Sequence, residues 1–381
     1  MKELGSSYFE YRKHKTDFNT EVTAGVTTFL TMAYIMFLNP FILSGEFAGT
    51  DAGFFDFGSV FTATIVATAI ACFIMAFYGK TWPIGLAPGM GVNAFVAYTI
   101  VAGNGYTPAE ALGAVLVAGI LFLIVSLTPA RAWIINSIPK SLKLGIGAGI
   151  GLFLAIIGLE IMGVIADHPV TFVTLGNLKH PLLLLGALAF VVMIVLEKKK
   201  VKGNIIIAIL GFSVLAWLPI WGWTGSTIEG GTSLAKFNGV FDFPPYPGYL
   251  FKFEIGKVLA VSGLSTLFTL FFIDFFDTAG TLTSVANISG KIDSRGKIQD
   301  IDKAMLSDSV GTVAGALVGT STVTSYVESG AGVKAGGRTG MTALVIGVLF
   351  LLCLGFAPLA TSLPKEIDGA ALVYVAVLFV R

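Results

Sequence analysis

The sequence contains few charged residues. Only 12% of its 381 residues are Asp, Glu, Lys or Arg, whereas 55% are hydrophobic; an ordinary soluble domain has about twice that charged share. The formal net charge of +1 excludes nucleic-acid binding driven by bulk charge. The composition therefore predicts a polytopic protein of the cell membrane, with the lipid bilayer as its partner.

Cysteine and histidine are also scarce. The two cysteines, Cys72 and Cys353, both lie inside apolar runs, which indicates neither a disulfide framework nor a metal site. The three histidines, His14, His168 and His180, all lie outside the apolar runs. We therefore expect no cofactor, no metal and no histidine relay across the membrane.

Apolar runs are abundant. The first twenty residues are polar and contain no apolar core of signal-peptide length, so we expect a mature, cytoplasmic amino terminus. Runs near the length that crosses a bilayer follow, at Val22–Leu43, Val60–Phe77, Ala111–Leu127, Leu144–Met162, Pro181–Leu196, Ile205–Ile220, Val258–Phe276, Ala343–Ala360 and Ala370–Val380. Three weaker segments lie between them, at Gly85–Val101, Ala304–Leu317 and Gly319–Gly332. Counting all of them predicts about twelve spans, an arrangement that places most Lys and Arg residues on the cytoplasmic side.

Two carboxylates interrupt one of these runs. Asp274 and Asp277 lie within Phe271–Thr281, a stretch that otherwise resembles the middle of a membrane helix. An acid at a helix centre costs about 2.5–3.5 kcal/mol on an insertion scale, and such residues usually mark functional sites. A spacing of three residues places both acids on one helix face, which predicts a polar site at that face.

Two weak segments contain residues that break helices. Gly85–Phe95 includes Pro88 and three further glycines, and Gly319–Gly332 begins with β-branched and hydroxyl residues. Interrupted spans in the two halves of a transporter-like chain indicate a binding site near the bilayer midplane. Asn93 lies on the first segment and Glu328 on the second, so both are candidate site residues.

Structural roles remain open for several candidates. Glu328 could form an ion pair with Lys334 or Arg338, Asn93 could only satisfy the backbone at the break, and Asp308 could bond to hydroxyls of the neighbouring strand. The phenylalanines near the acids, including Phe95 and Phe271, could stack on a flat ring or pack in the core.

Four motifs together resemble those of the AzgA-like purine permeases of the nucleobase:cation symporter superfamily. They are Gly85–Phe95, Phe272–Thr281, Ser307-Asp308-Ser309, and Tyr326–Gly332. The resemblance implies an all-α membrane fold of two inverted seven-span repeats, with core and gate domains and with the third and tenth spans each broken into a short strand and a half helix. About twelve spans are present here, so the last two gate spans are expected to be missing.

The implied domain boundaries follow the spans. They are 1–20 for a cytoplasmic segment, 21–128 for core spans one to four, 129–220 for gate spans five to seven, 221–252 for an extracellular loop, 253–360 for core spans eight to eleven, and 361–381 for the start of the second gate part.

The resemblance also implies residue roles in a proton symporter of purine nucleobases such as guanine, hypoxanthine, adenine or xanthine. Asp274, Glu328 and Asn93 are similar to substrate-binding residues of the family, and Asp277 and Asp308 to acids that support binding or coupling. Phe95, Phe271 and Ser329 complete the expected binding set. A homodimer is a further implication of the resemblance.

Other functions remain as alternatives. The transporter could prefer uracil or xanthine, or use sodium in place of protons. An anion permease of the same fold is less compatible with a site that collects four acids. An intramembrane aspartyl protease would require a Gly-x-Gly-Asp context that the sequence lacks, and a channel would trap a cation at such a site. We therefore expect a transporter, not an enzyme.

Overall fold

The chain forms a mostly helical structure with two compact units. The computed structural model describes residues 7–45, 54–128, 140–168, 171–218, 234–243, 246–293 and 297–380. Unit 1 comprises Met1–Lys143 and Pro244–Leu354, and unit 2 comprises Leu144–Phe243 and Gly355–Arg381. Parts of the predicted connector at 129–142 and of the predicted loop at 221–252 lie outside the described residues.

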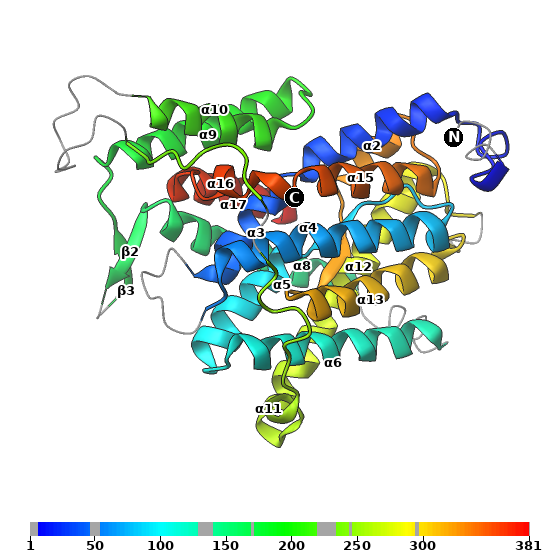
Figure 1. Cartoon of the computed structure of the whole chain (residues 1–381), viewed down its shortest axis with the longest axis horizontal. Helices are drawn as coiled ribbons and strands as arrows, with labels where there is room; N and C mark the ends of the chain where they lie inside the picture. The colour runs from blue at the N-terminus through cyan, green and yellow to red at the C-terminus, as the bar shows by residue number, and fades with distance from the viewer. Residues whose placement is uncertain are drawn as a thin grey trace. The chain divides into compact units, whose positions relative to one another are not determined.

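Unit 1 contains most of the helices and one two-stranded sheet, and Figure 1 labels most of these helices. Its elements are α2 (Phe18–Met32), α3 (Ile35–Ser44), α4 (Phe57–Ile74), η2 (Met75–Gly79), β1 (Leu86–Pro88), α5 (Met90–Ala94), η3 (Phe95–Gly103), α6 (Pro108–Leu127), α11 (Gly256–Leu259), η4 (Val261–Gly263), α12 (Leu264–Ser289), α13 (Ile301–Val318), β4 (Val323–Ser325), α14 (Ser329–Lys334) and α15 (Gly340–Leu352). Helix α13 packs between α4 and α6, and α15 packs against α2 and α4.

Capping residues begin several of these helices. The side chain of Asp17 accepts a hydrogen bond from the backbone N–H of Thr20 at the start of α2. Thr107 and Glu110 form a reciprocal capping box at the start of α6. Helix α12 ends at Gly290, whose φ of 69° lies in the left-handed region that glycine adopts without strain.

The two predicted broken segments meet in an antiparallel sheet. Strand β1 pairs with β4 in the register Leu86 to Ser325, Ala87 to Thr324 and Pro88 to Val323. Each strand is followed by a short helix, α5 after β1 and α14 after β4. Because backbone polar groups at membrane depth need partners inside the protein, this pairing explains how two non-helical segments are tolerated there.

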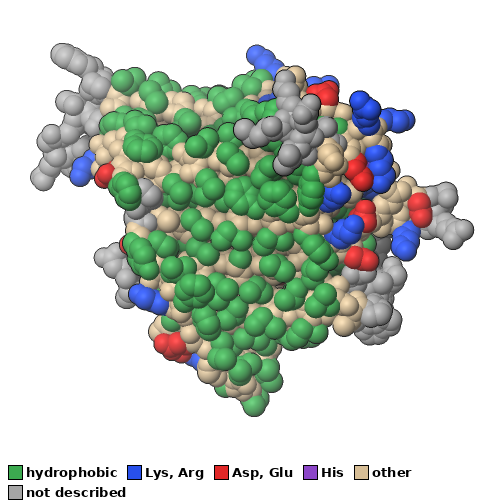
Figure 2. Space-filling model, turned by 45° about the vertical axis from the view of Figure 1, so that its right-hand side comes forward, with side chains coloured by type: hydrophobic (Ala, Val, Ile, Leu, Met, Phe, Trp, Pro, Cys, Tyr) green, Lys and Arg blue, Asp and Glu red, His purple; other side chains and the backbone are tan. Residues whose placement is uncertain are grey.

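Several described helices have the length and composition of membrane spans. Among the described residues, five helices qualify, or six if the pair Gly340–Leu352 and Leu354–Ala360, bent by 43°, counts as one. Three shorter apolar helices lie at Met90–Gly103, Gly151–Ile161 and Asn204–Trp217. The face in Figure 2 is covered largely by hydrophobic side chains, with many of its charged groups gathered along one margin. The total of twelve spans stays a prediction.

Unit 2 contains helices and a hairpin. Its elements are α8 (Lys140–Ile161), which begins at the unit boundary, β2 (Ile165–His168), β3 (Phe172–Leu175), α9 (Pro181–Lys198), α10 (Asn204–Trp217), η5 (Leu354–Phe356), α16 (Ala357–Ala360) and α17 (Lys365–Val380). Helix α9 packs against both α10 and α17. The β2–β3 hairpin was not predicted and departs from the all-α description, because two four-residue strands beside long apolar helices give only a weak sequence signal.

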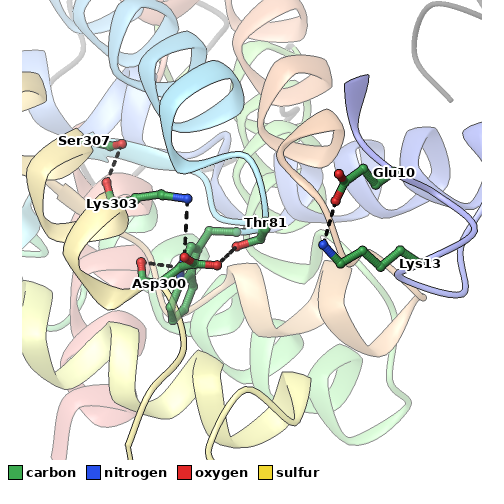
Figure 3. Close-up of polar contacts among 7 residues, drawn as sticks. Glu10, Lys13, Thr81, Asp300, Lys303 and Ser307 are labelled. Atoms are coloured by element: carbon green, nitrogen blue, oxygen red, sulfur yellow. Dashed lines mark hydrogen bonds and ion pairs between the residues drawn. The ribbon is translucent and has the colours of Figure 1, made fainter. Parts of the chain in front are cut away.

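A polar cluster links the connection between η2 and β1 to the connection between α12 and α13 and to the first turn of α13 (Figure 3). Asp300 accepts a hydrogen bond from the Thr81 hydroxyl over 3.3 Å and lies 3.4 Å from the Lys303 ammonium group. Its backbone carbonyl accepts a bond from Nε1 of Trp82. Lys291 lies beside this cluster with its ammonium 5.4 Å from the centroid of the Trp82 ring, and only 8% of the residue is exposed. A nearly buried lysine thus has an aromatic ring as a neighbour.

Replacing Lys291 with methionine is expected to stabilise the protein at neutral pH. Burial lowers the pKa of Lys291, an effect that Asp300 partly offsets and the charge of Arg338 increases. At a pH below the folded-state pKa, the lysine is charged in both the folded and the unfolded protein, so folding bears the full cost of desolvating the charge. This cost disappears as the pH rises towards the pKa of the lysine in the unfolded protein. Methionine should raise the free energy of unfolding on the order of 0.5–1 kcal/mol at pH 7.

Thermal unfolding in detergent between pH 6 and pH 10 measures this effect. The gain should shrink as pH rises, and Lys297→Met, which changes an exposed lysine of the same connection, is the control. A gain that stayed constant with pH would contradict the desolvation argument.

Candidate functional site

The acidic pair lies in the interior of α12. The structure extends this helix to Ser289, so Asp274 and Asp277 lie near its middle and not near the end of the predicted run at Phe276. Asp274 is fully buried and Asp277 is half-buried. Both acids therefore lie in the middle of a long apolar helix, where a charge is costly.

Asp274 has one satisfied and one unsatisfied oxygen. Its Oδ2 accepts a 3.1 Å hydrogen bond from the hydroxyl of Thr312 on α13. That hydroxyl is also 2.7 Å from the carbonyl of Val323 in β4, so its single proton is shared between two acceptors. The other carboxylate oxygen, Oδ1, is buried and has no hydrogen-bond partner, and the Thr322 hydroxyl is a further polar neighbour of this carboxyl group. Asp274 thus holds a buried acceptor that a ligand donor could satisfy.

Asp308 links three elements through its two oxygens. Oδ1 accepts from the Thr278 hydroxyl of α12 over 2.8 Å, and Oδ2 accepts from the Ser325 hydroxyl of β4 over 2.6 Å. Thr278 also lies 3.0 Å from the hydroxyl of Thr324. The hydroxyl bonding that the sequence left open for Asp308 is therefore present, and the carboxyl group is held in a fully buried position.

Glu328 pairs with a tyrosine. It lies directly before α14, is half-buried, and accepts a 2.7 Å hydrogen bond at Oε1 from the Tyr34 hydroxyl. Arg338, a partner considered from the sequence, donates through Nη1 to the carbonyls of Val333 and Gly337. In the described part of the chain, none of the ion pairs involves Glu328, Asp274, Asp277 or Asp308.

Asp277 approaches the beginning of α5. A Cβ atom added to Gly89 would lie 3.6 Å from Oδ2 of Asp277 and only 2.7 Å from Cγ2 of Thr324. Glycine at this position therefore permits β4 and the acidic face of α12 to approach the first broken segment closely. Asp308 bonds to Ser325 of β4, and the Thr312 hydroxyl lies between Asp274 and the carbonyl of Val323 in the same strand. The four carboxylates consequently form one acidic group around the β1–β4 sheet.

Asn93 is fully buried on α5. Its Nδ2 donates a 2.9 Å hydrogen bond to Oδ1 of Asn39 on α3, while its own Oδ1 is buried without a partner. The alternative in which Asn93 only satisfies the backbone is not what the structure shows, since its partner is a side chain. Asn93 provides a second unsatisfied acceptor in unit 1.

The other predicted binding residues have different surroundings. Ser329 is buried, and its hydroxyl accepts a 3.0 Å bond from the N–H of Gly85, which ties the second broken segment to the first. Phe271 is buried in an aromatic cluster, with ring centroids 5.2 Å from Phe272 and 5.8 Å from Phe275. Phe95 begins η3 and is half-buried. Of these three, Ser329 and Phe271 already have partners within the protein.

Sequence reasoning missed several polar partners. Asn39, Tyr34 and Thr312 hold the predicted residues in place, and none was singled out. A further omission is Glu21 of α2, which is fully buried and accepts a 2.8 Å bond from the N–H of Arg338 and a 2.6 Å bond from the hydroxyl of Thr342. Asn39 and Glu21 lie in or beside the first apolar run, so the rule that identified Asp274 could have found them.

The chain is similar to known transporters. The profile of the Permease family, Xan_ur_permease, matches residues 19–381. A putative permease of Methanocaldococcus jannaschii is 42% identical, over 98% of this chain and 81% of its own length. The adenine permease AdeP of Escherichia coli is 36% identical over 97% of this chain and 79% of its own length. The guanine/hypoxanthine permease PbuO of Bacillus subtilis is 38% identical over 97% of this chain and 83% of its own length.

Solved structures share the fold. The transmembrane domain of the cyanobacterial bicarbonate transporter BicA superposes with a TM-score of 0.69 at 18% identity, covering 95% of this chain and 88% of that one. The murine Slc26a9 anion transporter gives a TM-score of 0.63 at 10% identity, over 95% and 60% of the two chains. At these identities the likeness concerns the fold alone. The sequence relatives are transporters and not enzymes, and they confirm the predicted resemblance to purine permeases. The chain belongs to the Permease family.

Proposed function

We propose that the chain is a secondary transporter that imports purine nucleobases together with protons. The observation that carries this proposal is the acidic group around the β1–β4 sheet, which contains unsatisfied acceptors and no ion pair among the described residues. Relatives named as adenine and guanine/hypoxanthine permeases support purines as the substrate class.

The chemistry of the site suits a neutral base with ring N–H groups. Asp274 and Glu328 would accept hydrogen bonds from the purine, and bonds to charged acceptors in a dry site are stronger than neutral ones. Asn93 would contribute its unsatisfied carbonyl, and Ser329 would contribute its hydroxyl. Phe95 and Phe271 would complete the apolar walls on either side of the ring.

A proton would be carried by Asp277 or Asp308. Replacing Asp308 with asparagine is expected to remove the dependence of uptake on pH, because an amide keeps one acceptor for Thr278 or Ser325 but cannot take up a proton. The ratio of initial uptake rates at pH 5.5 and pH 7.5 should fall to about 1, while hypoxanthine affinity changes by about tenfold or less. An unchanged pH ratio would exclude Asp308 as the proton carrier and leave Asp277 as the proposed one.

The transport cycle would use motion between two domains. Unit 1 would act as the core that carries the substrate site and unit 2 as part of the gate, in the inverted seven-span arrangement that the resemblance implies. The predicted cytoplasmic amino terminus, inner-membrane location and homodimer belong to the same proposal.

Uptake in cells that lack their own purine carriers tests the proposal. Radiolabelled hypoxanthine, adenine, guanine and uracil would be supplied at pH 5.5 and pH 7.5, with and without a protonophore, and with sodium or potassium as the only monovalent metal ion. Purine uptake that the protonophore abolishes and sodium does not stimulate would support the proposal. Sodium-dependent purine uptake would identify sodium, and not the proton, as the coupling ion. Saturable bicarbonate uptake without purine uptake would favour an anion permease.

A further inference from the structure

We infer that Asn39 is a positioning residue, which fixes the amide of Asn93 so that its carbonyl oxygen, and not its NH₂ group, is available to a ligand N–H. The inference rests on the proposed function. It adds that the purine must donate a hydrogen bond to Asn93 and not accept one from it. Asn39 itself need not touch the substrate. It acts through a chain of four buried side chains on four segments of unit 1.

The chain begins at a group whose polarity is fixed. The Thr64 hydroxyl on α4 donates its only proton to the carbonyl of Val60 over 2.7 Å. A backbone carbonyl can only accept, and with its proton directed there the oxygen of Thr64 accepts from its next neighbour. That neighbour is Asn39, whose side-chain nitrogen lies 2.7 Å away. The end of the Asn39 amide that faces Thr64 is therefore the NH₂ group.

A second contact strengthens this orientation. The same NH₂ group donates to the hydroxyl of Thr320, just before β4, over 2.8 Å. With both N–H groups of Asn39 engaged, its Oδ1 faces Asn93 and must accept there. Asn39, Thr64, Thr320 and Asn93 are all fully buried, so water does not compete for these bonds.

The polarity is then passed to Asn93. Its Nδ2 donates to Oδ1 of Asn39 over 2.9 Å and lies 3.9 Å from the sulfur of Met90, a weak acceptor. The NH₂ group of Asn93 is thus directed to protein partners, and Oδ1 is left buried with no donor. A flipped amide would instead place two carbonyl oxygens against each other at the Asn39 contact, so the orientation of Asn39 disfavours it.

Two acceptors without donors set the requirement on the ligand. Oδ1 of Asn93 on α5 and Oδ1 of Asp274 on α12 are both buried and unpartnered, and these two helices contact each other. A purine edge with N–H groups would satisfy both, whereas an edge with only ring nitrogen acceptors or an N-methyl group would leave them unpaired. A site built to bond an N–H rejects analogues that lack it.

Equilibrium binding to the purified full-length chain tests the inference. The ligands are hypoxanthine and its 1-, 7- and 9-methyl derivatives. The 1-methyl derivative lacks the N–H of the six-membered ring, and the 7- and 9-methyl derivatives lack the N–H of the imidazole ring. We expect wild type to bind hypoxanthine and to reject at least one methyl derivative. Asn39→Leu should weaken hypoxanthine binding about tenfold and should reduce the discrimination against that derivative, because Asn93 is then free to rotate.

Variants of α4 provide the matched comparison. Thr64→Val removes the acceptor for Asn39. It should weaken hypoxanthine binding and reduce the discrimination, by a smaller factor than Asn39→Leu does. Thr68→Val is the control, because this threonine lies one turn along the same helix, is equally buried, and has a hydroxyl with no hydrogen-bond partner. We expect it to change affinity by less than about twofold.

The outcomes separate the two proposals. Weaker binding with reduced discrimination in Asn39→Leu and Thr64→Val, but not in Thr68→Val, would support the inference, and either of the first two variants suffices if the other fails to fold. Wild-type affinity and discrimination in both would overturn the inference and leave the proposed function standing. Absence of purine binding by wild type would overturn the proposed function and this inference with it.

Discussion

Replacing Asp274 with asparagine is expected to reduce purine uptake to background. Asp274 is fully buried, and the one oxygen without a partner is the acceptor that we assign to the ligand. Asparagine has nearly the same shape, but it lacks the charge and replaces one acceptor by a donor, so a purine N–H would meet an N–H. Losing a charged, buried hydrogen bond costs on the order of 2–5 kcal/mol, which corresponds to roughly 30-fold to several thousand-fold in affinity or rate.

Initial rates of hypoxanthine uptake and equilibrium binding would be measured together. Asp302→Asn is the control, because it makes the same change at an exposed carboxylate in the first turn of α13. We expect this control to transport normally. Uptake near the wild-type rate by Asp274→Asn, at equal membrane abundance, would remove Asp274 from the binding site.

Replacing Glu328 with glutamine is expected to weaken purine binding about 10-fold to 100-fold. Glutamine retains an oxygen that can accept the bond from Tyr34, so the position of the side chain should be preserved. The change removes the negative charge and one of the acceptors on a half-buried carboxylate directly before α14. The loss should therefore appear as a higher Kd with a nearly unchanged unfolding midpoint.

Two comparisons make this measurement specific. Tyr34→Phe removes only the donor that holds Glu328, and it should weaken binding less than Glu328→Gln does. Glu254→Gln, at an exposed position of unit 1, should have no effect. If Glu328→Gln bound hypoxanthine with wild-type affinity, the role of Glu328 as a substrate ligand would have to be abandoned.

The composition identified a membrane protein, the interruptions of its apolar runs indicated candidate site residues, and the resemblance of four motifs to purine permeases indicated transport. Asp274 and Asp277 could be recognised because an acid within an apolar helix is costly and is retained only for a reason. The breaks at Gly85–Phe95 and Gly319–Gly332 could be recognised because Pro and Gly weaken helices. These signals are local, so they are visible without knowledge of the fold.

The partners of those residues could not be predicted in the same way. Tyr34 and Glu328 are 294 positions apart, and Asn39 and Thr320 are 281 apart. No local pattern encodes such a pair, since each side chain would be equally plausible against many others. The β2–β3 hairpin was missed for a different reason, because short β-rich runs beside long apolar helices give a weak signal.

The sequence by itself determined which residues are too polar for their surroundings and where the helices must break. Only the tertiary structure decided that β1 and β4 pair, that Asp308 is enclosed by the hydroxyls of Thr278 and Ser325, and that Asn93 faces Asn39. The physical reason is that the cost of burying a polar group is a property of the residue, whereas its compensation depends on which distant groups the packed helices bring within hydrogen-bond distance.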